Sequence, residues 1–183
     1  MLKNVSVWLA AMLVATSALA VIKTETVEYA SDGTIMEGYV AYDDAKKSSP
    51  AILVVHDWMG PSDFTKAKAE QLAKEGFVAF VADIYGKGVR PHDASEAAKL
   101  AGKFKEDRKL MRSHAQAALD KLSAMPNVDK KKIVAIGYCF GGTVALELAR
   151  SGAPLAATTT FHGGLATPTP QDAKNIKGPV LVL

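Results

Sequence analysis

The chain has 183 residues, of which 49% are hydrophobic and 22% are charged. This balance excludes a disordered or fibrous protein, and the length suits one globular domain with a buried core. Lysine and arginine number 22 against 19 acidic residues, which gives a formal net charge of +3. Because the basic residues are scattered over expected helix faces, we expect no nucleic-acid partner.

The first twenty residues have the pattern of a signal peptide. Lys3 supplies a positive start, Val5–Ala15 is an apolar core, and Ala18-Leu19-Ala20 matches the small-x-small cleavage pattern. The segment is short for a membrane span, and no later segment could cross a bilayer. We therefore predict a signal peptide at residues 1–20, a mature domain at residues 21–183, and export to a periplasm or beyond, with no membrane partner after cleavage. An uncleaved N-terminal anchor is the alternative.

The mature sequence begins with the pattern of a β-hairpin. Thr26–Tyr29 and Thr34–Ala41 nearly alternate in polarity around the turn dipeptide Asp32-Gly33. Tyr42–Pro50 is polar and predicts a surface loop. Ala51–Val55 is a continuous apolar run rich in β-branched residues, which is typical of a strand buried on both faces.

Two helical regions and a further strand follow. Phe64–Lys74 has helical spacing and ends before a glycine suited to a helix C-terminus, and Phe77–Ala82 predicts a second buried strand. Asp93 is a candidate N-cap for a helical region that runs to about Met125. We expect this region to be interrupted near Gly102.

The rest of the chain predicts strands at Ile133–Ile136, Ala156–Phe161 and Val180–Leu183. Strands that alternate with helices indicate βαβ units, and right-handed crossovers place the helices on both faces. The predicted fold class is therefore α/β with a mostly parallel sheet. In such sheets ligands bind at the carboxyl ends of the strands.

The most informative motif is Gly137-Tyr138-Cys139-Phe140-Gly141, which follows the Ile133–Ile136 strand directly. This G-x-C-x-G pattern is a nucleophile elbow with cysteine in place of serine. A nucleophile on so tight a turn has a strained backbone, and its flanking positions leave no room for a Cβ atom. The helix-compatible segment Thr143–Ala149 would direct free N–H groups at the thiol and favour the thiolate. The alternative is an ordinary buried cysteine in a tight β–α turn.

Cys139 is the one cysteine of the chain, so it cannot form an internal disulfide. In an exported protein a free thiol is at risk of oxidation, and reactivity explains its presence better than packing does. A thiol redox role lacks a resolving cysteine. Four histidines without ligand spacing predict no metal, and no motif predicts a cofactor.

Three stretches resemble the dienelactone hydrolases, which are cysteine members of the α/β-hydrolase fold. They are AILVVHDWMG at residues 51–60, VAFVADIY at 78–85 and VDKKKIVAIGYCFGG at 128–142. The resemblance runs from about Thr26 to the last residue. It implies a monomeric hydrolase that cleaves a small ester or lactone, with Cys139 as the nucleophile that forms an acyl-enzyme.

The resemblance also implies the residues around the nucleophile. The backbone N–H groups of Phe140 and Trp58 would form the oxyanion hole. Asp57 falls where the family often has a glutamate that handles the thiol proton. From chemistry alone, a carboxylate beside a thiol would keep the resting cysteine neutral. The alternative for Asp57 is a polar loop residue that caps the backbone after a strand.

For substrate binding, the resemblance points to Tyr85 and Lys87, where the family uses a tyrosine and a basic residue to hold a carboxylate. Arg90 is a competing candidate, and a solvated turn is the alternative for this segment. His162 would lie near the mouth of the site as a substrate contact, or else is a loop histidine. We expect no chemistry at the other histidines, which are His56, His92 and His114.

In this fold the triad acid and histidine come after the nucleophile, beyond the strand that begins at Val180. The sequence stops at Leu183, so we expect a C-terminally truncated hydrolase that lacks the last strand or strands and helices. His162 and Asp172 could serve as an improvised base and orienter. The alternative to an enzyme is a catalytically inactive remnant or binding module that kept the elbow by descent.

Overall fold

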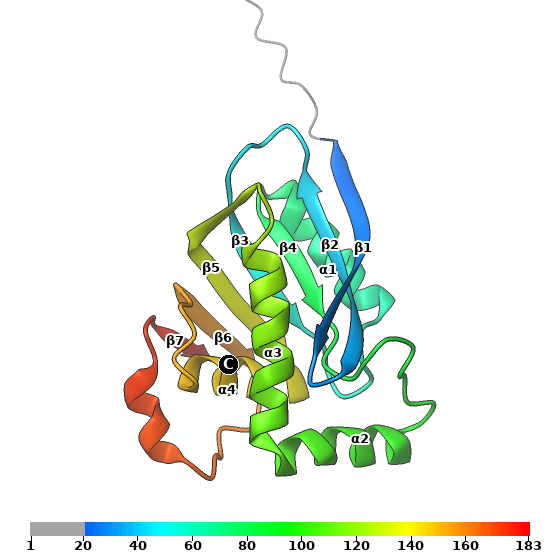
Figure 1. Ribbon diagram of the computed structural model, residues 1–183, viewed down its shortest axis with the longest axis vertical. Coiled ribbons are helices and arrows are strands. Elements are labelled where there is room, and N and C mark those ends of the chain that lie inside the picture. The colour runs from blue at the N-terminus through cyan, green and yellow to red at the C-terminus, as the bar shows by residue number, and fades with distance from the viewer. Residues whose placement is uncertain (1–20) are drawn as a thin grey trace, which may run out of the picture.

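The computed structural model describes residues 21–183, so the predicted signal peptide at residues 1–20 lies outside the described residues. A single seven-stranded sheet runs through the domain in the order β1-β2-β4-β3-β5-β6-β7 (Figure 1). The strands are β1 (Ile22–Ser31), β2 (Thr34–Asp43), β3 (Ser49–Val55), β4 (Val78–Ala82), β5 (Val128–Tyr138), β6 (Ala157–Phe161) and β7 (Val180–Val182). The helices are α1 (Asp63–Lys74), α2 (Ala94–Glu106), α3 (Arg108–Ser123), α4 (Phe140–Arg150) and the 3-10 helix η1 (Pro170–Asn175).

The predicted hairpin is present as β1 and β2, which pair antiparallel. β2 pairs antiparallel with β4, and every later neighbour in the sheet is parallel. The polar loop predicted at Tyr42–Pro50 is shorter than expected, because β2 continues through Asp43 and β3 begins at Ser49. The mostly parallel α/β fold with helices on both faces is confirmed.

Alternate residues of β3 enter two separate cores. Leu53 and Val55 pack with α3 and α4 on one face, and Val54 packs with α1 on the other. Figure 1 shows α3 in front of the sheet and α1 behind it. This double burial is why the strand reads as a continuous apolar run in the sequence.

The predicted interruption of the helical region near Gly102 is wrong. Gly102 lies inside α2, and the break comes at Asp107, which lies between α2 and α3. The Oδ1 atom of Asp107 accepts a hydrogen bond from the N–H of Leu110 at 2.9 Å and so caps α3. A glycine inside a helix costs only about 1 kcal/mol, whereas a side-chain cap starts a new helix, so the aspartate decides the boundary.

β5 is longer than the predicted Ile133–Ile136 strand, because it begins at Val128. Its first residues include the exposed run Lys130 to Lys132, and the pairing with β3 shifts register between Ser49 and Ala51. The predicted strand left this part out because its composition is polar. Within residues 21–183, no helix is long and apolar enough to cross a bilayer.

Candidate active site

Cys139 lies on the sharp turn between β5 and α4. Its backbone has φ 53° and ψ −114°, a left-handed conformation that non-glycine residues rarely adopt. The turn is held from the neighbouring strand, because the N–H of Cys139 donates to the carbonyl oxygen of Phe161 at 2.9 Å. Cys139 is half-buried. Such localised backbone strain is a feature of functional sites.

The two glycines of the motif have no room for a side chain. A Cβ atom at Gly137 would lie under 3.0 Å from backbone atoms of Gly141, and one at Gly141 would lie under 3.0 Å from the carbonyl oxygen of His56. Backbone atoms cannot move aside as the end of a flexible side chain can. The close approach of the strand, the turn and the helix therefore requires glycine at both positions, as the motif predicts.

Two backbone amides near the thiol are available to bind an oxyanion. Phe140 is the first residue of α4, where helical N–H groups lack a partner, and Trp58 lies in the turn after β3. Within residues 21–183, neither amide donates to a backbone acceptor. The positive end of the α4 dipole adds to the attraction for negative charge at this point. The oxyanion role of both residues remains a prediction.

Asp57 holds the turn after β3. Its Oδ1 atom accepts a hydrogen bond from the N–H of Met59 at 2.8 Å, and its carbonyl oxygen accepts one from the N–H of Gly60 at 3.3 Å. This is the backbone-capping role that the sequence left open as an alternative. The residue is half-buried, and its role toward the thiol proton remains a prediction.

Tyr85 joins the turn after β3 to the turn after β4. Its hydroxyl donates to the carbonyl oxygen of Trp58 at 2.9 Å. Burial raises the pKa of Tyr85 well above its usual range, and the charges of Asp57 and Cys139 raise it further. The ring of Tyr85 also lies 5.3 Å, centroid to centroid, from the ring of Phe140, the residue that follows Cys139. A neutral phenol bonded to the backbone positions the turn and does not supply a base.

Two buried histidines fix the backbone of Ile84, next to Tyr85. The N–H of Ile84 donates to Nε2 of His56 at 3.1 Å, and its carbonyl oxygen lies 2.8 Å from Nδ1 of His114. Since Nε2 of His56 accepts, its Nδ1 carries the proton and donates to the carbonyl oxygen of Asp57 at 2.6 Å. Burial lowers the pKa of His56 to about 4, which keeps the ring neutral. No signal in the sequence pointed to this role beyond a histidine at the end of an apolar strand.

Asp83 completes the same turn. Its Oδ1 atom accepts hydrogen bonds from the N–H groups of Tyr85 at 3.0 Å and Gly86 at 3.1 Å. The side chain is fully buried, and Arg90 lies 3.5 Å away with its Nη1 atom. The sequence did not predict this role for Asp83, although an acidic residue directly after a buried strand is a recognisable signal of a functional or turn-capping position.

The two basic candidates for anion binding lie in different surroundings. Lys87 pairs with Glu28 of β1 and, at 3.6 Å, with Glu37 of β2, so its ammonium group faces the hairpin. Arg90 instead packs on the turn after β3, where its Cδ atom lies 3.1 Å from the position of a Cβ atom on Gly60. Arg90 is therefore the cation that reaches the oxyanion turn.

His162 is exposed and has φ 42°, and its N–H donates to the carbonyl oxygen of Leu183 at 2.7 Å. The carboxylate of Asp172 accepts hydrogen bonds from Nη1 of Arg112 and from the hydroxyl of Thr169, each at 2.8 Å. Asp172 is thus paired with Arg112 and not with His162, so the structure does not form the improvised base and orienter. His92 is an exposed loop residue whose N–H donates to Glu96.

A buried ion network anchors the segment after β6 to the elbow helix. Glu147 of α4 accepts hydrogen bonds from Nε and Nη2 of Arg112 at 2.9 and 2.7 Å and from Nη1 of Arg150 at 2.9 Å. Arg150 also donates to the carbonyl oxygen of Leu165 at 2.9 Å, and Arg112 reaches Asp172 in η1. The loop beside the nucleophile is therefore fixed by charges that sequence reasoning did not connect.

The match to known families agrees with this geometry. The family model of the dienelactone hydrolase family matches residues 36–183. The chain belongs to the dienelactone hydrolase family. By family it is an ester or lactone hydrolase. Within residues 21–183, no group of three histidine, cysteine or acidic side chains is arranged to hold a metal ion.

Individual relatives resemble the chain over most of its length. Protein usf of Aquifex pyrophilus is 31% identical over 163 residues, which cover 87% of this chain and 69% of that protein. The solved structure named m3DLH superposes with a TM-score of 0.85 at 40% identity, covering 88% of this chain and 68% of its own. A dienelactone hydrolase-like promiscuous phosphotriesterase from metagenomic libraries gives a TM-score of 0.83 at 41% identity, covering 88% and 67%. The chain thus spans about two thirds of the length of these relatives.

Proposed function

We propose that the protein hydrolyses a small ester or lactone through an acyl-enzyme on Cys139. The observation that carries this proposal is the strained, half-buried cysteine at the start of α4, between two glycines that tolerate no Cβ atom. This geometry presents a nucleophile above the carboxyl edge of a parallel sheet, where ligands of this fold class bind. A structural cysteine would have no need of the strained backbone.

In the proposed reaction the sulfur of Cys139 attacks the carbonyl carbon and forms a C–S bond. Negative charge develops on the carbonyl oxygen, and the amides of Phe140 and Trp58 are available to donate to it. The carboxylate of Asp57 takes up the thiol proton. Collapse of the tetrahedral intermediate breaks the C–O bond, and the proton leaves with the alcohol. Water then cleaves the thioester and releases a carboxylic acid and the free thiol.

The test measures hydrolysis of p-nitrophenyl acetate and of a simple enol lactone by the full chain and by the variants Cys139→Ala and Cys139→Ser. We expect turnover, or at least a burst of one equivalent of alcohol per chain, in the wild type and neither in Cys139→Ala. Hydrolysis that persists in Cys139→Ala would overturn the nucleophile assignment. A folded wild-type chain without burst or turnover would favour the inactive binding module.

We also propose that residues 1–20 direct export. The proposal is supported by the positive start, apolar core and small-x-small pattern of that segment. N-terminal sequencing of the protein recovered from an expressing bacterium should give Val21 as the first residue. Recovery of the protein in the cytosol with the first twenty residues still attached would contradict export.

A further inference from the structure

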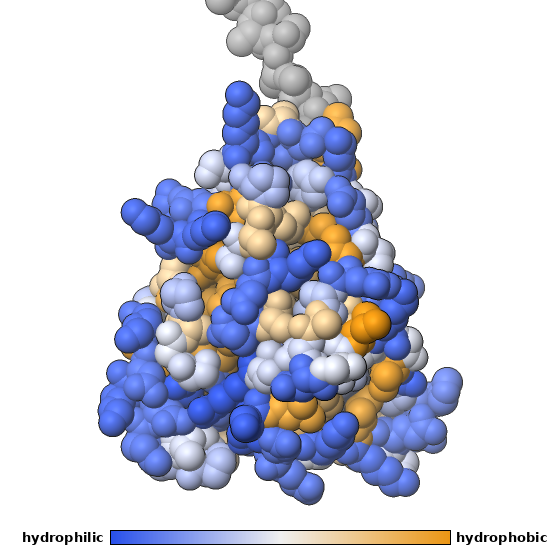
Figure 2. All heavy atoms as spheres, in the orientation of Figure 1, coloured by the Kyte–Doolittle hydropathy of each residue, from blue (hydrophilic) through white to orange (hydrophobic). Residues whose placement is uncertain are grey.

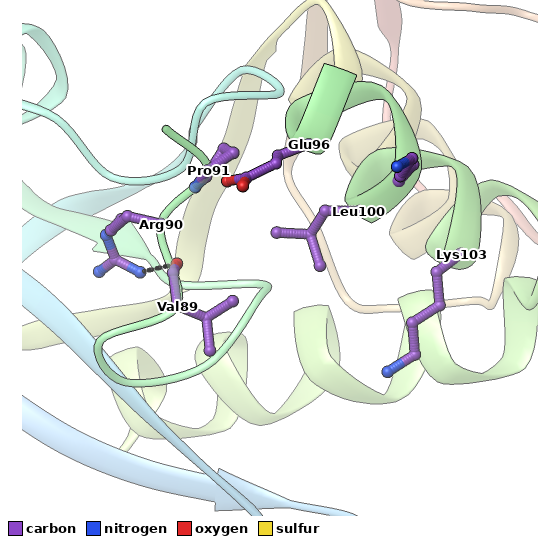
Figure 3. A pocket seen from close by; sticks show the side chains of 7 residues that line it. Val89, Arg90, Pro91, Glu96, Leu100 and Lys103 are labelled. Carbon is purple, nitrogen blue, oxygen red and sulfur yellow. Dashed lines mark hydrogen bonds between the residues drawn. The ribbon is translucent and has the colours of Figure 1, made fainter. Parts of the chain in front are cut away.

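A groove separate from Cys139 lies between the loop after β4 and helix α2 (Figure 3). Its volume is about 380 Å³, which lies within the range of small-molecule sites. Val89, Pro91 and Leu100 supply apolar walls, and Arg90, Lys99 and Lys103 supply cations. Cys139 is not one of the lining residues. The groove is therefore a second concave site, distinct from the elbow.

Apolar surface is open to water in this groove. Val89 is 42% exposed, and Figure 3 shows its side chain and that of Leu100 in the hollow between the loop and α2. The face in Figure 2 is mostly hydrophilic, with apolar side chains exposed at separate places in both its upper and its lower half. Burial of such surface by a ligand is favourable.

The charges around the groove are unbalanced. Lys99 and Lys103 lie one turn apart on α2, and like charges at this spacing repel each other. Among residues 21–183, neither ammonium group is in an ion pair with a carboxylate. One carboxylate, that of Glu96, also lines the groove and accepts a hydrogen bond from the N–H of His92 at 2.9 Å, so the three cations outnumber it. An anion between the two lysines would relieve the repulsion.

We propose that this groove binds an apolar monocarboxylate, whose chain or ring packs on Val89 and Leu100 while its carboxylate lies between Lys99 and Lys103. An apolar body next to two cations matches this chemical class and disfavours both polar anions and apolar cations. Arg90 connects the groove to the elbow region, because it lines the groove and also packs against Gly60 in the oxyanion turn.

The groove could also hold the acid that the reaction releases, a step that rests on the proposed function. Hydrolysis of an apolar ester releases an apolar carboxylic acid, which is ionised at neutral pH. The groove would then hold the acid product beside the elbow after its release. Binding of the carboxylate itself needs no turnover, so it is measurable whether or not the chain hydrolyses esters.

The test is a titration of the full chain with octanoate, followed by amide shifts in two-dimensional NMR. We expect saturable shifts centred on Val89 and Leu100, with a Kd on the order of 1 mM for a ligand of this size. Acetate has the charge without the chain, and octyltrimethylammonium has the chain with the opposite charge. Neither should saturate. Equal binding of either control, or no octanoate binding at about ten times that concentration, would overturn the proposal.

Charge-reversal variants test the position of the carboxylate. Lys99→Glu/Lys103→Glu should weaken octanoate binding at least about tenfold, while Lys105→Glu, the matched exposed control on the same helix, should change it less than about twofold. Val89→Asp should also weaken binding. Equal losses in Lys105→Glu and the double variant would overturn the site.

A last variant separates this site from the elbow. Cys139→Ala should bind octanoate as the wild type does, because Cys139 does not line the groove. Loss of binding in Cys139→Ala would place the ligand at the elbow and overturn the proposal.

Discussion

The buried carboxylate of Glu147 gives the sharpest stability prediction. Its side chain is 0% exposed and accepts three hydrogen bonds from Arg112 and Arg150. Glu147→Gln keeps the shape but removes the charge and turns an NH₂ group toward a guanidinium. Breaking a buried ion pair costs about 3–5 kcal/mol. Because Arg112 keeps Asp172 and Arg150 keeps the carbonyl oxygen of Leu165, we expect the lower end, about 3 kcal/mol.

The assay is urea denaturation at pH 7, followed by far-UV circular dichroism. The matched control is Glu106→Gln, an exposed glutamate at the end of α2, which should change the free energy of unfolding by less than about 0.5 kcal/mol. A loss of less than about 1 kcal/mol in Glu147→Gln would refute the reasoning.

The same variant carries a pH dependence with a defined sign. The arginine hydrogen bonds hold the pKa of Glu147 below its usual value of 4.5, against the opposing effect of burial. The stabilisation is therefore complete above that value and is lost as the pH falls through the lowered pKa in the folded state. The gap in unfolding free energy between wild type and Glu147→Gln should narrow at acidic pH. A gap that widens there would contradict the ion network.

Three further predictions concern glycine positions, the buried His56 ring and the cap of α3. In urea denaturation, Gly141→Ala should destabilise the protein by more than about 3 kcal/mol or prevent folding, because the added Cβ atom meets the carbonyl oxygen of His56. Gly102→Ala has open space around the added Cβ atom and should stabilise the protein by up to about 1 kcal/mol. The His56 ring should titrate near pH 4 in proton NMR of the folded protein, and titration near 6.5 would contradict this. Because an unfolded histidine takes up its proton near pH 6.5, the folded state should lose up to about 3 kcal/mol of stability as the pH falls from 6.5 to 4. Asp107→Ala should cost about 1 kcal/mol in the same denaturation assay by removing the cap on Leu110, and an unchanged midpoint would mean that the cap is not what starts α3.

The features that the sequence predicted well are those set by local chemistry. The elbow could be predicted because its G-x-C-x-G pattern lies within five residues of chain, although the space at Gly141 is limited by the carbonyl oxygen of His56, after β3. The run Ala51–Val55 could be predicted as a strand because burial on both faces leaves a continuous apolar pattern. The helix break was misplaced because a glycine weakens a helix only slightly, whereas the cap at Asp107 depends on the geometry of one side chain.

The features that the sequence did not predict depend on contacts between distant segments. Arg112, Glu147 and Asp172 lie on three elements; the first two read as ordinary helix charges, and the sequence suggests His162, not Arg112, as the partner of Asp172. The two hydrogen bonds to the backbone of Ile84 likewise need a histidine that follows β3 and one from α3. Among the candidate substrate residues, nothing in the local pattern distinguishes a lysine that pairs with the hairpin from an arginine that reaches the oxyanion turn.

The central claim is that the fold makes Cys139 a nucleophile for esters. The most direct measurement compares the rate of acylation of Cys139 by p-nitrophenyl acetate with its rate of alkylation by iodoacetamide, by mass spectrometry, in the folded and the urea-unfolded chain. Alkylation passes through no oxyanion, so it reports only the exposure and ionisation of the thiol. An oxyanion donor contributes about 10²–10³ in rate, so folding should raise the ratio of acylation to alkylation by about a hundredfold. The same ratio in folded and unfolded chains would contradict the account.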